Sequence, residues 1–296
     1  MNDSSIISQV VKIEKSGRKT ATHFVLFNGT QMRYLIDLHG GKIRLSQNLS
    51  PYSRKLAFLM RFMIFLPFSL LCCIKLGYFI KAELHAEVEK CRKNTNKKYW
   101  NMIIGTYDEK QKLVIQCFND TDPAVFIKIG NEATQEEMNA EICFLKKRKK
   151  YTSFAIPELL DSSSRSEGSN FNIQVTKEFF GRKVEPMLTQ EIVDIYQELS
   201  RDVQNGFTFS HGDFAPWNLK RNHQKYTLFD WEHCGYRMPG FDLMHYVEMI
   251  EIVINKKGFS EAFESGLASI QKYIPDFEID KDMFLDEFRK LRTQIK

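Results

Sequence analysis

Three side chains in the second half of this sequence have the types and spacing that phosphoryl transfer requires. Asp213 is followed five residues later by Asn218, and Asp230 comes at the end of a short apolar run. A carboxylate in the first position can orient an acceptor hydroxyl and take its proton, while an amide oxygen and a second carboxylate can hold Mg²⁺ against phosphate groups. The set therefore predicts a site for ATP, Mg²⁺ and a hydroxyl acceptor.

The residues around these positions form two motifs. The first is His-Gly-Asp-Phe-Ala-Pro-Trp-Asn over residues 211–218, and the second is Asp-Trp-Glu over residues 230–232. Protein kinases place His-Arg-Asp and Asp-Phe-Gly in the same order, with the same spacing from Asp to Asn. Here Gly212 stands where the Arg would be, and Asp-Trp-Glu stands where Asp-Phe-Gly would be.

These variants resemble the aminoglycoside phosphotransferase and choline kinase-like family, and the resemblance is specific from about residue 128 to residue 242. It implies an α+β, bilobal protein kinase-like fold with a small β-rich N-lobe and a helical C-lobe, preceded here by an N-terminal extension. It also implies four roles, which are the catalytic base for Asp213, magnesium ligands for Asn218 and Asp230, a brace of the catalytic loop for His211, and support of that loop from below for Asp242.

Two more residues of the motifs each have two interpretations. Glu232 can bind a second metal ion or the acceptor, or it can form a salt bridge within its loop. Trp217 can shape the acceptor pocket, or it can pack under the catalytic loop, which is the interpretation that we favour.

A lobe that binds ATP in this way needs a lysine on a strand, where it reaches the phosphates. Residues 124–129 read as a buried strand bounded by Asp122-Pro123 and Gly130. Lys128 lies among apolar neighbours there, and lysine is uncommon in such a position unless it has a charged partner or a functional role. Contact with phosphate explains it, and the alternative is a lysine on an edge strand that faces water.

The same lobe needs a helical glutamate to hold that lysine. Residues 134–149 are dense in good helix formers and follow the strand directly. Glu141 is our preferred partner for Lys128, because Ile142 and Leu145 would face the core of the lobe. Glu137, one turn earlier on the same face, is the alternative.

Residues 100–119 are typical of a β-hairpin that would cover the phosphates. Two strand-like runs, 102–107 and 112–118, flank a polar turn at residues 108–110. The hairpin contains only Gly105, so the kinase G-x-G-x-x-G is missing, and no P-loop or Rossmann fingerprint occurs elsewhere. The phosphate clamp is therefore assigned only to Thr106 and backbone amides.

The connector between the lobes is expected at residues 174–181. Gly181 allows the chain to turn there, and backbone groups from Lys177 to Phe179, including those of Glu178, would hydrogen-bond adenine. We place the N-lobe at residues 99–180 and the C-lobe at residues 181–296. Helices are predicted in the C-lobe over residues 189–203, 241–257, 260–274 and 280–294.

The N-terminal extension, residues 1–98, contains two strand-like runs around Asn28-Gly29, a strong hairpin signal. Residues 56–80 are rich in apolar side chains and predict a pair of buried or interfacial helices. The longest uncharged run, residues 62–74, has thirteen residues, whereas a membrane-spanning helix needs about 20. Basic residues flank the run, so residues 55–81 also suit peripheral contact with an anionic membrane.

Composition agrees with a folded enzyme of 296 residues, 43% hydrophobic and 27% charged, with a net charge of +5. The short basic clusters are typical of solvated helix ends, and no motif accompanies them, so we expect no specific nucleic-acid partner. Six scattered cysteines suit a reducing compartment. The polar start of the chain predicts a cytoplasmic protein, at the inner face of the membrane if the apolar segment makes contact.

Two classes of function follow from the sequence. The first is an ATP-dependent phosphotransferase that moves the γ-phosphate of Mg-ATP to a hydroxyl of a small molecule, sugar or glycan. The second is a catalytically inactive kinase-like scaffold or binding module, associated with a membrane or with glycan assembly. The complete set of Lys, Glu, Asp, Asn and Asp favours the first, and the unusual extension favours the second.

Overall fold

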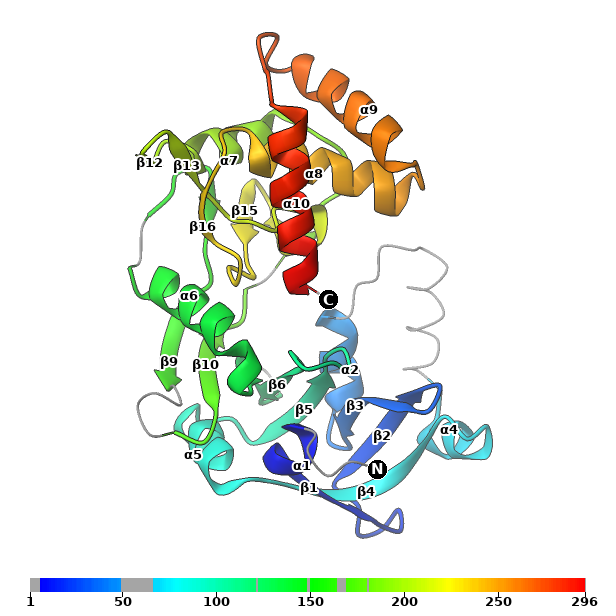
Figure 1. The fold of residues 1–296 in the computed structure, drawn as a ribbon. Coiled ribbons are helices and arrows are strands. Elements are labelled where there is room, and N and C mark those ends of the chain that lie inside the picture. Colours follow the sequence, from blue (N-terminus) through cyan, green and yellow to red (C-terminus); the bar gives the residue numbers. More distant parts are fainter. Residues whose placement is uncertain are drawn as a thin grey trace. The chain divides into compact units, whose positions relative to one another are not determined.

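The computed structural model describes residues 6–48, 66–120, 122–147, 150–163, 169–179 and 181–295 (Figure 1). It contains helices and largely antiparallel sheets, which confirms the predicted α+β class. The chain divides into two compact units. The first unit comprises Met1–Met138 and Glu158–Glu178, and the second comprises Asn139–Pro157 and Phe179–Lys296.

The first unit is built on a nine-stranded sheet in which every strand pairs antiparallel with its neighbours. Its order is β1-β4-β2-β3-β5-β6-β7-β10-β9. The strands are β1 (Val11–Lys15), β2 (His23–Asn28), β3 (Gln31–Asp37), β4 (Gly77–Leu84), β5 (Tyr99–Ile104), β6 (Lys112–Phe118), β7 (Val125–Gly130), β9 (Leu159–Ser163) and β10 (Asn172–Lys177). Short helices α1 (Ile6–Val10), α2 (Gly41–Asn48), α4 (Phe68–Cys73) and α5 (Ala86–Asn94) belong to the same unit.

Apolar side chains fill both faces of this sheet. One face buries a large cluster that includes Val25, Leu35, Met102 and Ile115. The other face carries a smaller cluster around Phe24 and Ile36, against which α4 packs through its buried Leu71. Because successive residues of a strand point to opposite faces, neighbouring residues such as Phe24 and Val25 serve different clusters.

The two predicted hairpins are confirmed. Strands β2 and β3 pair around Gly29, whose φ of 62° suits a glycine in the turn. Strands β5 and β6 pair from Tyr99 opposite Phe118 to Ile104 opposite Leu113.

Strands on both sides of residue 98 belong to one sheet, because β3 pairs with β5 through Tyr34 opposite Ile103 and Leu35 opposite Met102. The predicted division into an extension, an N-lobe and a C-lobe stays a prediction. The helical expectation for residues 77–80 is wrong, since these residues begin β4. Tyr78 pairs with Val25, and a side chain at Gly77 would meet the Val25 carbonyl oxygen at 2.1 Å.

Residues 49–65, which carry the start of the predicted apolar helices and of the membrane segment, lie outside the described residues. Within the described ranges, no helix has both the length and the apolar character needed to cross a bilayer.

The second unit contains two smaller sheets and most of the helices. One sheet has the order β11-β14-β15-β8, and the other has the order β12-β13-β16. The strands are β8 (Phe154–Ala155), β11 (Arg182–Lys183), β12 (Val203–Gln204), β13 (Phe207–Ser210), β14 (Leu219–Asn222), β15 (Lys225–Leu228) and β16 (Gly235–Arg237). The helices are α7 (Gln190–Leu199), α8 (Phe241–Met249), α9 (Phe259–Gln271) and α10 (Lys281–Ile295), and α6 (Gln135–Lys146) begins in the first unit and ends in this one.

The predicted helices of this unit exist, but three end earlier than expected. Helix α9 stops at Gln271 instead of at residue 274. Helix α7 stops at Leu199, and Val203 starts strand β12 instead. Helix α8 passes into a π-helical turn at Ile250–Ile254. Aromatic rings form the packing of the C-terminal helices, with Phe284 in contact with Phe241, Phe263 and Phe288 at centroid distances of 5.5 to 5.8 Å.

Candidate active site

The two motifs of the sequence lie in the second unit and are brought together by a β-hairpin. Strand β13 leads into the loop that carries His211 and Asp213, and a 3₁₀ turn, Pro216–Asn218, follows. Strand β14 then pairs with β15, and the amide of Phe229 donates to the carbonyl of Asn218 at 3.0 Å. This pairing places Asn218 beside the residue that precedes Asp230.

The carboxylate of Asp242 holds the loop from the first turn of α8. It accepts hydrogen bonds from the Ser210 hydroxyl at 2.6 Å, the His211 amide at 2.7 Å and the Gly212 amide at 3.0 Å. Asp242 is buried, so these charge-assisted bonds replace its lost hydration. Asp242 therefore supports the loop that carries His211 and Asp213, as the sequence predicts.

Gly212 shows why the arginine of protein kinases has no counterpart at this position. Its φ of 86° lies in the left-handed region, which favours glycine. A Cβ atom at this position would lie 2.1 Å from the carbonyl oxygen of His233. The loop therefore has no room for any side chain at residue 212.

His211 links the loop to the residue before Asp230. Its ring is fully buried, and its Nε2 lies 3.0 Å from the carbonyl oxygen of Phe229. Because a carbonyl only accepts, the proton of the ring is on Nε2. Burial lowers the pKa of His211, so the ring is neutral at physiological pH. It also packs against Trp231 at a centroid distance of 4.5 Å.

The carboxylate of Asp213 is contacted on both oxygens. The amide nitrogen of Asn218 donates to Oδ2 at 2.8 Å and to the Asp213 carbonyl at 2.8 Å. His245 Nε2 lies 3.7 Å from Oδ1, while its Nδ1 donates to the carbonyl of Phe214 at 3.1 Å. With its nitrogen on Asp213, the Asn218 amide directs its oxygen away, where it can serve another ligand.

The structure brings three carboxylates together beside this loop. One oxygen from each of Glu141, Asp230 and Glu232 lies within 4.8 Å of the others. Glu141 is buried and also accepts a hydrogen bond from the amide of Trp231 at 3.3 Å. A set of carboxylate oxygens suits a hard cation such as Mg²⁺, so the residues present fit the metal that the motifs imply.

The sequence predicts Glu141 as the partner of Lys128, and it does not predict its place beside Asp230 and Glu232. That place follows from the C-terminal part of α6, which belongs to the second unit and packs Phe144 against Trp231 at a centroid distance of 3.9 Å. The spacing of α6 alone could not reveal this contact, because Trp231 is distant in the sequence. The ion pair of Glu141 with Lys128 stays a prediction.

Lys128 lies on β7 in the first unit. Its strand is interior, since Lys128 is opposite Val114 on β6 and opposite Gln174 on β10. The alternative of a lysine on an edge strand is therefore wrong. Ile127 and Ile129 are buried on one face, and Lys128 is half-buried on the other. Contact of this lysine with phosphate stays a prediction.

Glu178 uses its side chain within the first unit. Its carboxylate accepts a hydrogen bond from the Ala124 amide at 2.7 Å, and its own amide donates to the Ala124 carbonyl at 2.9 Å. The amide of Lys177 likewise donates to Glu158 at 3.0 Å. These two backbone donors have partners within the first unit, and the contact of the connector with adenine stays a prediction.

Two aromatic rings pack together in the second unit, and one of them, Phe229, directly precedes Asp230. Phe179 and Phe229 lie 4.8 Å apart, and the ammonium group of Lys220 lies 4.7 Å from the centre of the Phe179 ring. Both rings are partly exposed. Trp217 is half-buried, and its packing under the catalytic loop stays a prediction.

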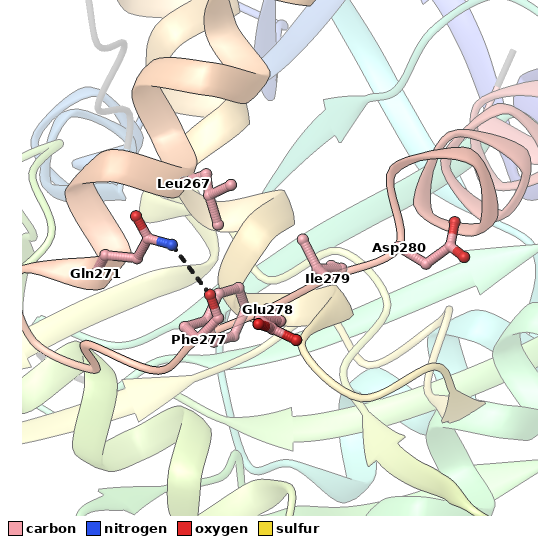
Figure 2. A pocket seen from close by; sticks show the side chains of 6 residues that line it. All are labelled: Leu267, Gln271, Phe277, Glu278, Ile279 and Asp280. Atoms are coloured by element: carbon pink, nitrogen blue, oxygen red, sulfur yellow. Dashed lines mark hydrogen bonds between the residues drawn. The ribbon is translucent and has the colours of Figure 1, made fainter.

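A separate cavity of about 500 Å³ lies at the turn between α9 and α10 (Figure 2). Its walls include Leu267, Phe277, Glu278 and Asp280, and Gln271 donates to the carbonyl of Phe277 at 3.2 Å. None of the predicted site residues lines this cavity.

Residues 143–274, a little under half of the chain, match the family model of choline/ethanolamine kinase. The matched range contains both motifs, the His-Gly-Asp loop and Asp-Trp-Glu. The resemblance predicted from the sequence is therefore confirmed. No curated protein matches the sequence.

Several solved structures resemble the chain at low identity. A type VIII aminoglycoside-3'-phosphotransferase has 11% identity and a TM-score of 0.48, with 71% of this chain and 100% of that one covered. Aminoglycoside phosphotransferase APH(4)-Ia with ADP and hygromycin B has 8% identity and a TM-score of 0.44, covering 71% and 87%. Amicoumacin kinase with AMP-PNP, Ca²⁺ and amicoumacin has 13% identity and a TM-score of 0.41, covering 71% and 84%.

Proposed function

We propose that this protein is an ATP-dependent phosphotransferase whose acceptor is a hydroxyl group of a small molecule, sugar or glycan. The observation that carries the proposal is the arrangement of the second unit. Asp213 is fixed by Asn218, and the carboxylates of Asp230, Glu232 and Glu141 converge beside the same loop. The match of this region to choline/ethanolamine kinase supports the same chemistry.

In this proposal, Asp213 orients the acceptor hydroxyl and takes its proton. The contacts from Asn218 and His245 fix the plane of the carboxylate, so little reorganisation is needed when the acceptor arrives. A positioned general base of this kind contributes roughly 10²- to 10⁴-fold to a reaction rate.

The oxygen of Asn218 and the carboxylates of Asp230 and Glu232 would hold Mg²⁺. The ion, when bound, neutralises charge on the phosphate groups that the reaction redistributes. Asp242 and His211 keep these ligands in place by fixing the loop and its junction with Phe229. Lys128 is proposed to contact the phosphates from the first unit.

Calorimetry of Mg-ATP binding tests the proposal, with the wild type compared with Asp230→Ala. We expect saturable binding that requires Mg²⁺ and that is lost or strongly weakened in the variant. Asp213→Asn is the matched control, because it should retain nucleotide binding and lose turnover in a screen of hydroxyl acceptors. A folded wild type that binds no Mg-ATP would contradict the proposal and favour a kinase-like scaffold.

A further inference from the structure

The turn between β5 and β6, residues 105–111, belongs to the hairpin that the sequence predicts to cover the phosphates. It has one glycine, Gly105, which is required by space, since a Cβ there would lie 2.6 Å from the Lys112 carbonyl oxygen. The amide of Gly105 donates to that same oxygen at 2.9 Å. A loop with a single glycine has little backbone flexibility. Its position is therefore set by the contacts that its residues make with neighbouring strands and helices.

Strand β3 holds the loop from one side. Arg33 donates through Nη1 to the carbonyl of Gly105 at 3.0 Å, and the hydroxyl of Tyr107 donates to the carbonyl of Met32 at 2.9 Å. The guanidinium of Arg33 also lies 5.8 Å from the centre of the Tyr107 ring. Two adjacent residues of β3 therefore bind two nearby residues of the loop.

Helix α6 and the end of β7 hold the loop from the other side. Glu137 forms ion pairs of 2.6 Å with both Lys110 and Lys112, and only 13% of the Glu137 side chain is exposed. The amide group of Asn131 donates to the carbonyl of Glu109 at 2.9 Å. All of these contacts lie within the first compact unit.

We propose that Arg33 and Tyr107 are positioning residues for the phosphate site, and that β3 acts as a fixed support for loop 105–111. The inference rests on the proposed phosphotransferase function and on the contact with the phosphates that the sequence predicts for Thr106. A loop that is ordered before the nucleotide binds loses less conformational entropy on binding. In this chain, contacts from the N-terminal strands replace the glycines that let other loops close on their ligand.

Hydrogen exchange of the full-length protein tests the support directly. In Arg33→Ala we expect peptides that cover residues 105–111 to exchange at least tenfold faster than in the wild type. Arg18→Ala, an exposed arginine of the same unit, is the matched control and should leave these peptides unchanged. Tyr107→Phe removes a single hydroxyl, so it gives the same test if Arg33→Ala does not fold. Unchanged exchange of the loop in folded Arg33→Ala or Tyr107→Phe would overturn the inference.

Calorimetry with Mg-ATP on the same variants links the loop to the nucleotide. We expect the Kd to rise five- to tenfold in Arg33→Ala and less in Arg33→Lys, and to stay constant in Arg18→Ala. A loosened loop with an unchanged Kd would overturn the positioning role, while the proposed function would stand. A loosened loop in a protein whose wild type binds no Mg-ATP would instead overturn the proposed function, and the phosphate role of the loop with it.

Discussion

At the scale of single residues, the position of the candidate base Asp213 depends on the side chains that contact its carboxylate. Asp213 has Asn218 on one oxygen and His245 near the other. The sequence predicts Asn218 as a magnesium ligand and not its hydrogen bond to Asp213, although five residues of loop are enough to bring the two side chains together. It does not predict His245, which lies on α8 three residues after Asp242. The signal was available, since residues three apart share a helix face.

His245 contacts both the Phe214 carbonyl and Asp213, and a pair of substitutions can distinguish the effects of these two contacts. In His245→Asn, the amide nitrogen takes the place of Nδ1, so the bond to Phe214 persists and the contact with Asp213 is lost. In His245→Gln, the amide nitrogen takes the place of Nε2 and can donate to Asp213, as Nε2 does when both ring nitrogens carry protons. We expect turnover to fall about tenfold in His245→Asn, which corresponds to about 1.4 kcal/mol, and to recover in His245→Gln.

Steady-state kinetics with calorimetry of Mg-ATP checks this prediction, and the Kd should not change in either variant. Equal loss of activity in both variants, accompanied only by a lower Tm, would mean that His245 serves packing and not the position of Asp213.

At the scale of elements, the sequence predicted helices and strands that have a clear local pattern. It did not predict which strands pair with one another in the sheets. Hairpins β2–β3 and β5–β6 were predicted because their turns and alternating side chains are local. Strand β4 was missed because its pairing with β1 and β2 joins residues that are distant in the sequence. An apolar run such as residues 77–80 fits a helix or a strand equally well until its neighbours are known.

Helix α7 is docked by a carboxylate whose protonation should set the acid stability of the second unit. Burial alone would raise the pKa of Glu198, but hydrogen bonds from the amides and hydroxyls of Ser153 and Thr152 lower it to about 2. The two amide donors lie 2.8 and 2.7 Å from its oxygens. Below pH 4.5 the unfolded state then binds more protons than the folded state.

The stabilisation from Glu198 should therefore be complete above about pH 4.5 and lost as the pH falls towards 2. We expect Glu198→Gln to have a lower Tm than the wild type at pH 7, and the difference to shrink steadily on acidification. Thermal unfolding followed by circular dichroism from pH 7 to pH 3 measures this. Glu185→Gln, at an exposed carboxylate outside α7, serves as control, and a difference in Tm that does not depend on pH would contradict the assignment.

At the scale of the whole molecule, the N-terminal residues are part of the first unit's framework. Strands β1 to β4 form one end of its nine-stranded sheet, and β3 is the direct neighbour of β5. The buried cluster of that unit includes Val25 and Leu35 from these strands and Met102 from β5. Sequence composition could not show this, because no local signal specifies that a strand continues a sheet formed by later residues.

Deletion of residues 1–98 should consequently prevent normal folding of the first unit. It would expose the edge of β5 and the apolar side chains that β2 and β3 cover, which favours association of the chains. We expect the truncated protein to elute as aggregates in size-exclusion chromatography and to be cleaved rapidly by protease, in contrast to the full chain. A monomeric, protease-resistant fragment would show instead that residues 99–296 fold without the preceding strands.

The long sheet also has consequences for solubility. In the described part of the chain, its two outermost strands are β1 and β9, and an open edge of backbone amides and carbonyls can recruit a strand from another molecule. Strand β1 places Lys12 and Glu14 on its exposed positions, paired at 2.8 Å. Strand β9 is short, and the pairing register shifts where it meets β10. Charge at one edge and irregularity at the other oppose the growth of this sheet into fibrils.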